Sequence, residues 1–388
     1  VEKQGNSTPV KAFPKIDPDD IAFIQFTSGS TGDPKGVKIS HKGLLININQ
    51  MIEGMRITPN DIFVSWLPVF HDMGLILMTM VPMFLGRPFY LLPVGINYLK
   101  EWLWIIHEKK ATFTAAPDFM YRITMRYIAN PADYNLSSLR VGLNAAEPVR
   151  AATIQGFETL FNIRDVLVPA YGLAEATVGV SCWYPGHPVR VDADGNVCVG
   201  KPFPGIEIRI DENEGPGREQ GEILVKSPAN TPGYFKNPRA DAALFTKDHF
   251  IRTGDLGYID ENGDLFVIGR KKNIIIHGGI TISSREVEEL IDTCHTVSRS
   301  AATGIDRGGS LGEQVFIFAE VKLTREQWQD SAFQETLTIE LVQLFHGHFG
   351  FRPGRVLLLK PKQIPTTLNG KTQYPVLIEQ VLSGRLGG

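Results

Sequence analysis

A loop rich in glycine and hydroxyl groups lies near the start of the chain. It follows the apolar segment 21–26 and reads FTSGSTGDPKGV over residues 26–37. Glycine lets the backbone approach a ligand and aim N–H groups at it, hydroxyl groups add donors, and Lys35 adds a positive charge. These groups suit a polyphosphate, although the spacing from Gly29 to Lys35 differs from the Walker A pattern. On composition alone, a solvent-exposed Gly/Ser turn is an equal alternative.

Four later motifs carry aromatic, acidic and basic side chains of kinds that can take part in binding or catalysis. YGLAE (171–175) supplies an aromatic ring and a carboxylate, and RTGD (252–255) supplies a second carboxylate. GRKK (269–272) supplies clustered cations, and GK (370–371) supplies a late lysine. Taken singly, each such charge is more often an exposed surface group than part of a site.

Taken together and in this order, the five motifs resemble those of the adenylate-forming superfamily, which includes acyl-CoA synthetases, nonribosomal adenylation domains and luciferases. The resemblance covers residues 20 to 380. It implies an enzyme that joins a carboxylic acid to the α-phosphate of ATP and releases pyrophosphate. It implies ATP and Mg²⁺ as cofactors, with Glu175 as the metal ligand. Because two anions must meet, Lys371 is expected to neutralise the developing charge.

The resemblance also implies a nucleotide site. Asp255 is expected to accept hydrogen bonds from the ribose hydroxyls, Tyr171 to stack on adenine, and Arg270 to support the ribose side. The other nucleotide-binding residues that the motifs imply are Thr27, Ser28, Gly29, Ser30, Thr31, Gly32, Lys35, Asn144, Ala145, Ala146, Glu147, Gly172, Leu173 and Ala174.

Two motifs point to one branch of this superfamily. WLPVFHDMGL (66–75) and NAAEPV (144–149) resemble the corresponding motifs of fatty acyl-AMP ligases, and Ala174 fits that branch as well. In this branch the acyl group passes from acyl-AMP to an acyl carrier protein rather than to coenzyme A. His71 is then expected near the carboxylate end of the acyl tunnel, with a packed core histidine as the alternative.

The sequence nevertheless does not decide which molecule accepts the acyl group. Only 25 positions separate Glu175 from Gly200, so the insertion usual in that branch is short or absent. The loop GGITI (278–282) lacks both the pattern of typical CoA ligases and the usual Asn of the branch, and Tyr374 stands where relatives often have Arg. An acyl-CoA synthetase is one alternative. A non-catalytic nucleotide- or acyl-binding module is another, against which Glu175 and Lys371 argue.

One apolar cluster follows His71. Methionine adapts to irregular space, so this cluster is a candidate wall for a fatty acyl chain, with ordinary core packing as the alternative. Its members are Met73, Leu75, Met78, Met80, Met83 and Phe84.

The elements that must position these motifs alternate between strands and helices up to about residue 185. Most of the strands are continuously apolar, as in a parallel sheet buried on both faces, and Ser40 is placed to cap a helix. The expected strands are 21–26, 62–66, 111–115, 139–144 and 165–169, and the helices between them include 99–109 and 150–161.

Strands joined by turns follow and predict a β subdomain over about 185–271. The expected strands are 206–210, 221–226, 257–260 and 265–269, with a hairpin turn at 261–264.

The remainder predicts a small α+β domain. SSRE (283–286) has the pattern of a capping box, 315–323 reads as a strand, and Leu337, Leu341, Leu344 and Phe345 form a helical stripe. The expected fold class is therefore α/β, the adenylate-forming fold. A large domain over 1–271 is followed by a small mobile domain over 272–388, which rotates about Lys272.

The composition limits the classes of partner that the protein is expected to bind. The 388 residues include 39 Lys and Arg against 42 Asp and Glu, so no nucleic-acid partner is expected to bind through bulk charge. No apolar run is long enough to span a membrane. Three widely spaced cysteines without a CxxC motif favour a reducing cytoplasm and a packing role.

The chain starts at Val1, and the family normally has a sizeable segment before its phosphate loop, so the large domain is expected to be incomplete at its N-terminus.

Overall fold

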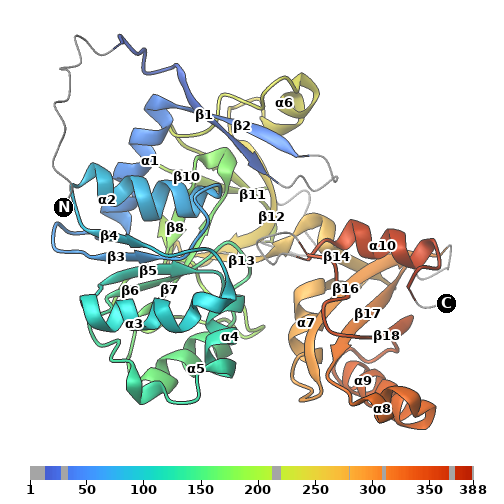
Figure 1. The fold of residues 1–388 in the computed structure, drawn as a ribbon. Helices are drawn as coiled ribbons and strands as arrows, with labels where there is room; N and C mark the ends of the chain where they lie inside the picture. Colours follow the sequence, from blue (N-terminus) through green and yellow to red (C-terminus); the bar gives the residue numbers. More distant parts are fainter. Residues whose placement is uncertain are drawn as a thin grey trace.

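The computed structural model describes residues 14–27, 34–211, 220–278, 280–307, 312–366 and 372–386. Figure 1 shows the elements up to β13 gathered in one body, with the later elements β16–β18 and α7–α10 to one side of it. Among the described residues, no helix has both the length and the apolar character needed to cross a membrane.

A seven-stranded sheet forms the centre of the larger body. Its order is β4-β3-β5-β6-β7-β8-β9. Neighbouring strands from β4 to β7 are parallel, β8 is antiparallel to β7, and β9 is antiparallel to β8. Every residue of β3, β5 and β6 is buried, which confirms that the continuously apolar segments are inner strands. The strands are β3 Phe63–Ser65, β4 Phe89–Leu91, β5 Phe113–Ala116, β6 Val141–Asn144, β7 Leu167–Gly172, β8 Gly179–Cys182 and β9 Lys201–Pro202.

Helices cover both faces of this sheet, with α1 and α2 on one side and α3, α4 and α5 on the other (Figure 1). The Ser40 hydroxyl accepts the Gly43 N–H at 3.0 Å and caps α1 as predicted. The helices are α1 His41–Gly54, α2 Val81–Phe84, α3 Leu99–Lys109, α4 Asp118–Tyr127 and α5 Ala151–Phe161.

The first strand departs from the prediction. β1 (Ile21–Thr27) pairs antiparallel with β2 (Lys35–Ser40) in a two-stranded sheet and does not join the parallel sheet. The expectation of a buried strand before the phosphate loop is therefore wrong, since Phe26 is 62% exposed. The buried strand of the hairpin is β2, whose Val37 and Ile39 are almost fully enclosed. A two-stranded sheet leaves much of each strand uncovered, so apolar composition did not imply burial here.

The predicted β subdomain contains an antiparallel sheet in the order β10-β11-β12-β13. The turn between β12 and β13 is confirmed, with Gly263 at φ +78° and its N–H donating to the Asp260 carbonyl at 2.9 Å. The predicted strand 257–260 is only the end of a longer β12. The elements are β10 Glu207–Asp211, β11 Gly221–Lys226, α6 Pro238–Leu244, β12 Ile251–Ile259 and β13 Leu265–Arg270.

The C-terminal elements form a mixed α+β unit. A hairpin of β14 and β15 precedes a sheet in the order β16-β17-β18, and the predicted stripe on α9 is confirmed by burial of Leu337, Leu341 and Phe345. The elements are β14 Ile274–His277, β15 Ile280–Ser283, α7 Ser284–Ile291, β16 Val297–Asp306, β17 Glu313–Val321, α8 Arg325–Gln329, α9 Ser331–Phe349, β18 Arg355–Leu359 and α10 Tyr374–Leu382.

The predicted capping box at the start of α7 does not form. Ser283 occupies the N-cap position, but its side chain makes no capping hydrogen bond. Ser284 instead donates to the Asn273 carbonyl at 2.6 Å, and Glu286 contacts His348. These tertiary partners compete with the local reciprocal bonds that a capping box requires.

The three cysteines, Cys182, Cys198 and Cys294, are buried and unpaired, as the packing interpretation predicts. Burial raises the pKa of the Cys182 and Cys198 thiols to about 12, which keeps them protonated.

Candidate active site

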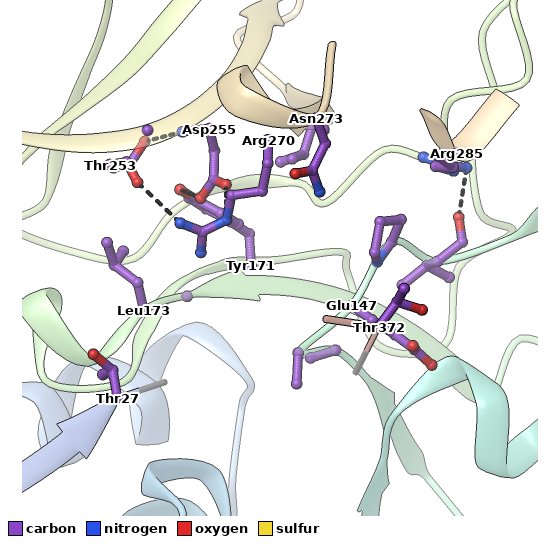
Figure 2. Close-up of a pocket in the computed structure, with 18 of the residues that line it drawn as sticks. Thr27, Glu147, Tyr171, Leu173, Thr253, Asp255, Arg270, Asn273, Arg285 and Thr372 are labelled. Carbon is purple, nitrogen blue, oxygen red and sulfur yellow. Dashed lines mark hydrogen bonds and ion pairs between the residues drawn. The ribbon is translucent and has the colours of Figure 1, made fainter. Parts of the chain in front are cut away.

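A cavity of about 1870 Å³ lies where the larger body meets the C-terminal elements. Its wall combines the ends of β6 and β7, parts of β12 and β13, and the segment 372–376 (Figure 2). Parallel strands bring their carboxyl ends to one edge of a sheet, and ligands of α/β proteins bind at that edge. The sequence-predicted residues that line the cavity are Thr27, Lys35, His71, Ala145, Ala146, Glu147, Tyr171, Gly172, Leu173, Ala174, Glu175, Asp255, Arg270 and Lys272.

The other predicted residues lie elsewhere. The side chain of Asn144 is fully buried behind the cavity wall and donates to Asp118 Oδ1 at 3.0 Å, so it supports the loop after β6. The loop residues Ser28, Gly29, Ser30, Thr31 and Gly32, together with Lys371, lie outside the described residues.

Asp255 is a carboxylate of the cavity wall that two other side chains hold in place. It lies opposite Arg270 in the pairing of β12 with β13, and Arg270 Nε lies 2.7 Å from its Oδ1. The Tyr171 hydroxyl donates to its Oδ2 at 2.7 Å, as Figure 2 shows. Burial, followed by the Asp255 charge, raises the pKa of Tyr171, so this hydroxyl remains a donor. The arrangement presents an oriented acceptor to the cavity.

Glu175 supplies the second carboxylate. It lies in the turn Ala174–Ala176 directly after β7, and its Oε1 accepts the Tyr234 hydroxyl at 2.8 Å. No cluster of three or more potential ligand side chains occurs in the part of the chain that the structure describes. Mg²⁺ commonly binds through one or two carboxylates, with substrate phosphates and water completing its shell. The carboxylate of Glu175 therefore fits a magnesium ion that arrives with a nucleotide.

Three of the cations that line the cavity lie close to these carboxylates. Lys35 begins β2, Arg270 ends β13, and Lys272 follows Arg270 closely. Partial burial, with the charges of Arg270 and Lys35, lowers the pKa of Lys272 to about 8. The cost of holding these cations together disappears when a polyanion binds between them. This part of the cavity is therefore suited to a polyphosphate.

His71 lies on the cavity wall, which argues against the packed-histidine alternative. Its Nδ1 lies 2.7 Å from Asp72 Oδ1, and its side chain is 23% exposed. Because Asp72 holds Nδ1, Nε2 is the ring nitrogen available to a substrate.

Glu147 is the charged member of the loop that follows β6. Ala146, just before it, has φ +70°, and the Glu147 carboxylate accepts the Phe119 N–H. Burial, followed by the Asp118 charge, raises the pKa of Glu147. The loop is thereby fastened to the start of α4 while its backbone lines the cavity.

The predicted acyl wall is only weakly supported. Of its six members, Met73 alone lines this cavity, beside Leu77. Met78 is fully buried, whereas Met83 and Phe84 are 61% and 51% exposed. The segment forms a π-helix over Met73–Met80 that continues into α2, and most of its side chains point away from the cavity.

The sequence motifs missed the contacts that join the C-terminal elements to the rest. Arg150 Nη1 donates to Asp292 Oδ2 at 2.9 Å, and Arg285 Nη2 donates to the Val149 carbonyl at 2.9 Å (Figure 2 shows the second contact). Thr372, from the same C-terminal part, lines the cavity. Arg150, Arg285 and Asp292 are ordinary surface types in the sequence, so no local signal identifies these contacts.

Tyr234 was missed as well. It lies in the loop between β11 and α6, next to Lys35 and Glu175. The sequence around it, TPGYFKNP, reads only as a turn, and its partner Glu175 lies 59 residues away.

Comparison with known proteins agrees with this geometry. Residues 2–235 match the family of AMP-binding enzymes. The medium-chain-fatty-acid–[acyl-carrier-protein] ligase JamA of Moorena producens is 31% identical, over 96% of this chain and 70% of that protein. A structure from work on fatty acyl-adenylate ligases of E. coli and L. pneumophila has a TM-score of 0.85 and 26% identity, over 97% of this chain and 72% of that one.

ATP-bound MatB from Rhodopseudomonas palustris has a TM-score of 0.79 and 26% identity, over 95% of this chain and 70% of that one. The predicted adenylate-forming fold and the resemblance to fatty acyl-AMP ligases are thus confirmed. The chain belongs to the family of AMP-binding enzymes.

Proposed function

We propose that this chain joins a fatty acid to ATP·Mg²⁺, giving acyl-AMP and pyrophosphate, and then transfers the acyl group to an acyl carrier protein. The single observation that carries the proposal is the cavity that gathers Glu175, Asp255, Arg270 and the segment 372–376. JamA, whose name gives a medium-chain fatty acid and a carrier protein, supports the choice of substrate and acceptor. The chain spans about 70% of the length of that relative.

The nucleoside is held by the residues around β7 and β12. The two ribose hydroxyls donate to Asp255, which Arg270 and Tyr171 hold in place. The ring of Tyr171 forms part of the cavity wall, where adenine can stack on it. The backbone of Gly172, Leu173 and Ala174 completes this side, and that of Ala145, Ala146 and Glu147 borders the adenine edge.

The phosphates are held by the cations and by the loop 28–32. Lys35 and Lys272 contact the β- and γ-phosphates, and Glu175 provides the protein's oxygen ligand to the metal. When bound, Mg²⁺ supplies charge neutralisation of the phosphates. Binding a polyanion beside Lys272 raises its pKa from about 8, so the lysine is charged in the complex.

In the first step a carboxylate oxygen of the fatty acid attacks the α-phosphorus, and the bond to the departing pyrophosphate breaks. Lys371 neutralises the charge between carboxylate and α-phosphate, and His71 Nε2 lies at the carboxylate end of the acyl site. Support for Lys371 comes from its neighbour Thr372, which lines the cavity.

In the second step the carrier thiol attacks the acyl carbon and AMP leaves. One site can serve both steps only if Lys371 leaves it between them, so we propose that the part of the chain over 272–388 turns relative to 1–271, with Lys272 as the hinge. Three buried, unpaired cysteines favour the cytoplasm as the location.

The experiment compares Lys371→Ala with Lys362→Ala, a control at an exposed lysine of the same region. Lys371→Ala is expected to abolish acid-dependent ATP–pyrophosphate exchange and to retain ATP binding, while Lys362→Ala retains both. Undiminished exchange in Lys371→Ala would refute the catalytic assignment. Absence of exchange in the unaltered protein would favour a non-catalytic binding module. Efficient formation of acyl-CoA in place of acyl carrier protein would overturn the proposed acceptor.

A further inference from the structure

One tyrosine touches two opposite charges of the phosphate site. The Tyr234 hydroxyl donates to Glu175 Oε1 at 2.8 Å, and Lys35 Nζ lies 5.2 Å from the centroid of the Tyr234 ring. The side chain is 6% exposed and lines the large cavity together with both charged residues. Its polar end and its ring face thus serve different partners.

The backbone around Tyr234 is fixed to the same two segments. The Phe235 N–H donates to the Gly36 carbonyl at 2.7 Å, next to Lys35. The Thr231 N–H donates to the Glu175 carbonyl at 2.8 Å. The loop that carries Tyr234 therefore ties the phosphate-loop hairpin to the turn after β7, and any shift of the tyrosine moves both.

A glycine permits this path of the chain. Gly233 has φ +128°, and a Cβ at this position would lie 2.7 Å from Asp241 Oδ1. That same oxygen accepts the Tyr234 N–H at 2.6 Å. A side chain at residue 233 would displace the group that orients Tyr234, because neither the backbone angle nor the space allows it.

The separation of the two charges matters for a polyphosphate site. In the described part of the chain, no ion pair joins Lys35 to Glu175, although both contact Tyr234. A direct ion pair between Lys35 and Glu175 would neutralise both charges. The lysine would then not be available to a phosphate, nor the carboxylate to a cation.

We propose that Tyr234 is a positioning residue of the phosphate site. Its hydroxyl orients the Glu175 carboxylate toward the metal that accompanies ATP, and its ring holds Lys35 apart from that carboxylate. The inference rests on the proposed function, because it requires Glu175 to be the metal ligand. A hydrogen-bond partner of a metal ligand changes metal affinity by about 10–100-fold when it is removed.

The test measures metal binding, with Mn²⁺ as the probe. In the presence of ATP, Mn²⁺ binding is followed by electron paramagnetic resonance for the unaltered protein, Tyr234→Phe and Tyr258→Phe. Tyr258 is the matched control, because its hydroxyl donates to Asp192 at 2.6 Å and it does not line the cavity. Tyr234→Phe is expected to weaken Mn²⁺ binding by about tenfold, while Tyr258→Phe leaves it unchanged.

A second variant separates the two contacts. Tyr234→Phe keeps the ring, so its affinity for ATP without metal, measured by calorimetry, is expected to remain that of the unaltered protein. Tyr234→Leu removes the ring as well and is expected to weaken metal-free ATP binding. Equal Mn²⁺ affinity in Tyr234→Phe and the unaltered protein would overturn the inference, as would a loss of ATP affinity in Tyr234→Phe as large as in Tyr234→Leu.

Glu175→Gln distinguishes failure of the inference from failure of the proposed function. If Glu175→Gln loses Mn²⁺ binding and Tyr234→Phe does not, Tyr234 has no positioning role but the metal site stands. If Glu175→Gln also binds Mn²⁺ normally, the metal assignment itself is wrong, and the inference fails with it. If the combined variant loses no more affinity than Glu175→Gln alone, Tyr234 acts through Glu175, as the inference requires.

Discussion

Asp292→Asn tests whether the contact between the C-terminal elements and the larger body serves the first reaction step. Asp292 Oδ2 lies 2.9 Å from Arg150 Nη1 and 3.7 Å from Arg122 Nη1, both across the contact. Its Oδ1 accepts the Ser300 hydroxyl at 2.8 Å within the C-terminal part. An asparagine keeps an acceptor for Ser300 and removes the charge that faces the two arginines, so the change is confined to the contact.

The magnitude follows from burial and geometry. The side chains of Arg150 and Asp292 are 17% and 16% exposed, so solvent screens them less than a surface pair. A hydrogen bond to a charged group contributes about 1.5–3 kcal/mol, and an exposed pair about 0–1 kcal/mol. For this partly enclosed pair we expect about 2 kcal/mol. A loss of about 2 kcal/mol lowers the equilibrium constant for the arrangement with Thr372 at the cavity wall, relative to other arrangements of the C-terminal part, by about 30-fold.

The assay separates the two half-reactions. Asp292→Asn is expected to lower acid-dependent ATP–pyrophosphate exchange by about 10–30-fold when this arrangement is the minor state, and to leave transfer from supplied acyl-AMP unchanged. Asp248→Ala is the control, because Asp248 pairs with Arg209 at 2.6 Å with both side chains about half exposed, away from the contact. An equal loss in both half-reactions, or no loss in either, would refute the reasoning.

Two further substitutions test the site and its electrostatics. Asp255→Asn is expected to lower ATP affinity by at least about tenfold, because it weakens the ribose acceptor and the pairing with Arg270; calorimetry showing unchanged affinity would contradict the ribose assignment. Burial raises the pKa of Glu288 from 4.5 to about 7, although the Tyr374 hydroxyl donates to its carboxylate at 2.7 Å. Folding therefore favours the protonated form of Glu288, and the resulting stabilisation is lost as pH rises from about 4.5 through 7. Glu288→Gln should flatten the dependence of melting temperature on pH over that interval, and an unaltered dependence would contradict the assignment.

Local sequence patterns predicted the parts of the fold that local physics determines. The boundaries of α3 were predicted residue for residue, and Ser40 caps α1, because apolar periodicity and a capping hydroxyl act within a few residues. Ser283 shows the limit of local prediction. The helix α7 starts where the sequence pattern predicts, but the expected capping hydrogen bond of Ser283 is absent.

Long-range contacts were not predictable in the same way. Apolar composition marked β1 as a strand, but the exposure of Phe26 depends on which strand β1 pairs with. The site motifs were recognisable because several chemical groups recur in a fixed order. Tyr234 and Asp292 belong to no such series of motifs. Only the folded chain brings Tyr234 to Glu175 and Asp292 to Arg150.

The central claim is that a carboxylate oxygen of the substrate becomes bonded to the α-phosphorus of ATP. Fatty acid labelled with ¹⁸O in both carboxyl oxygens tests this directly when it is supplied with ATP, Mg²⁺ and holo acyl carrier protein, and the released nucleotide is weighed by mass spectrometry. The account predicts AMP that carries a single ¹⁸O, together with unlabelled pyrophosphate. Unlabelled AMP, or ADP with labelled phosphate, would contradict it.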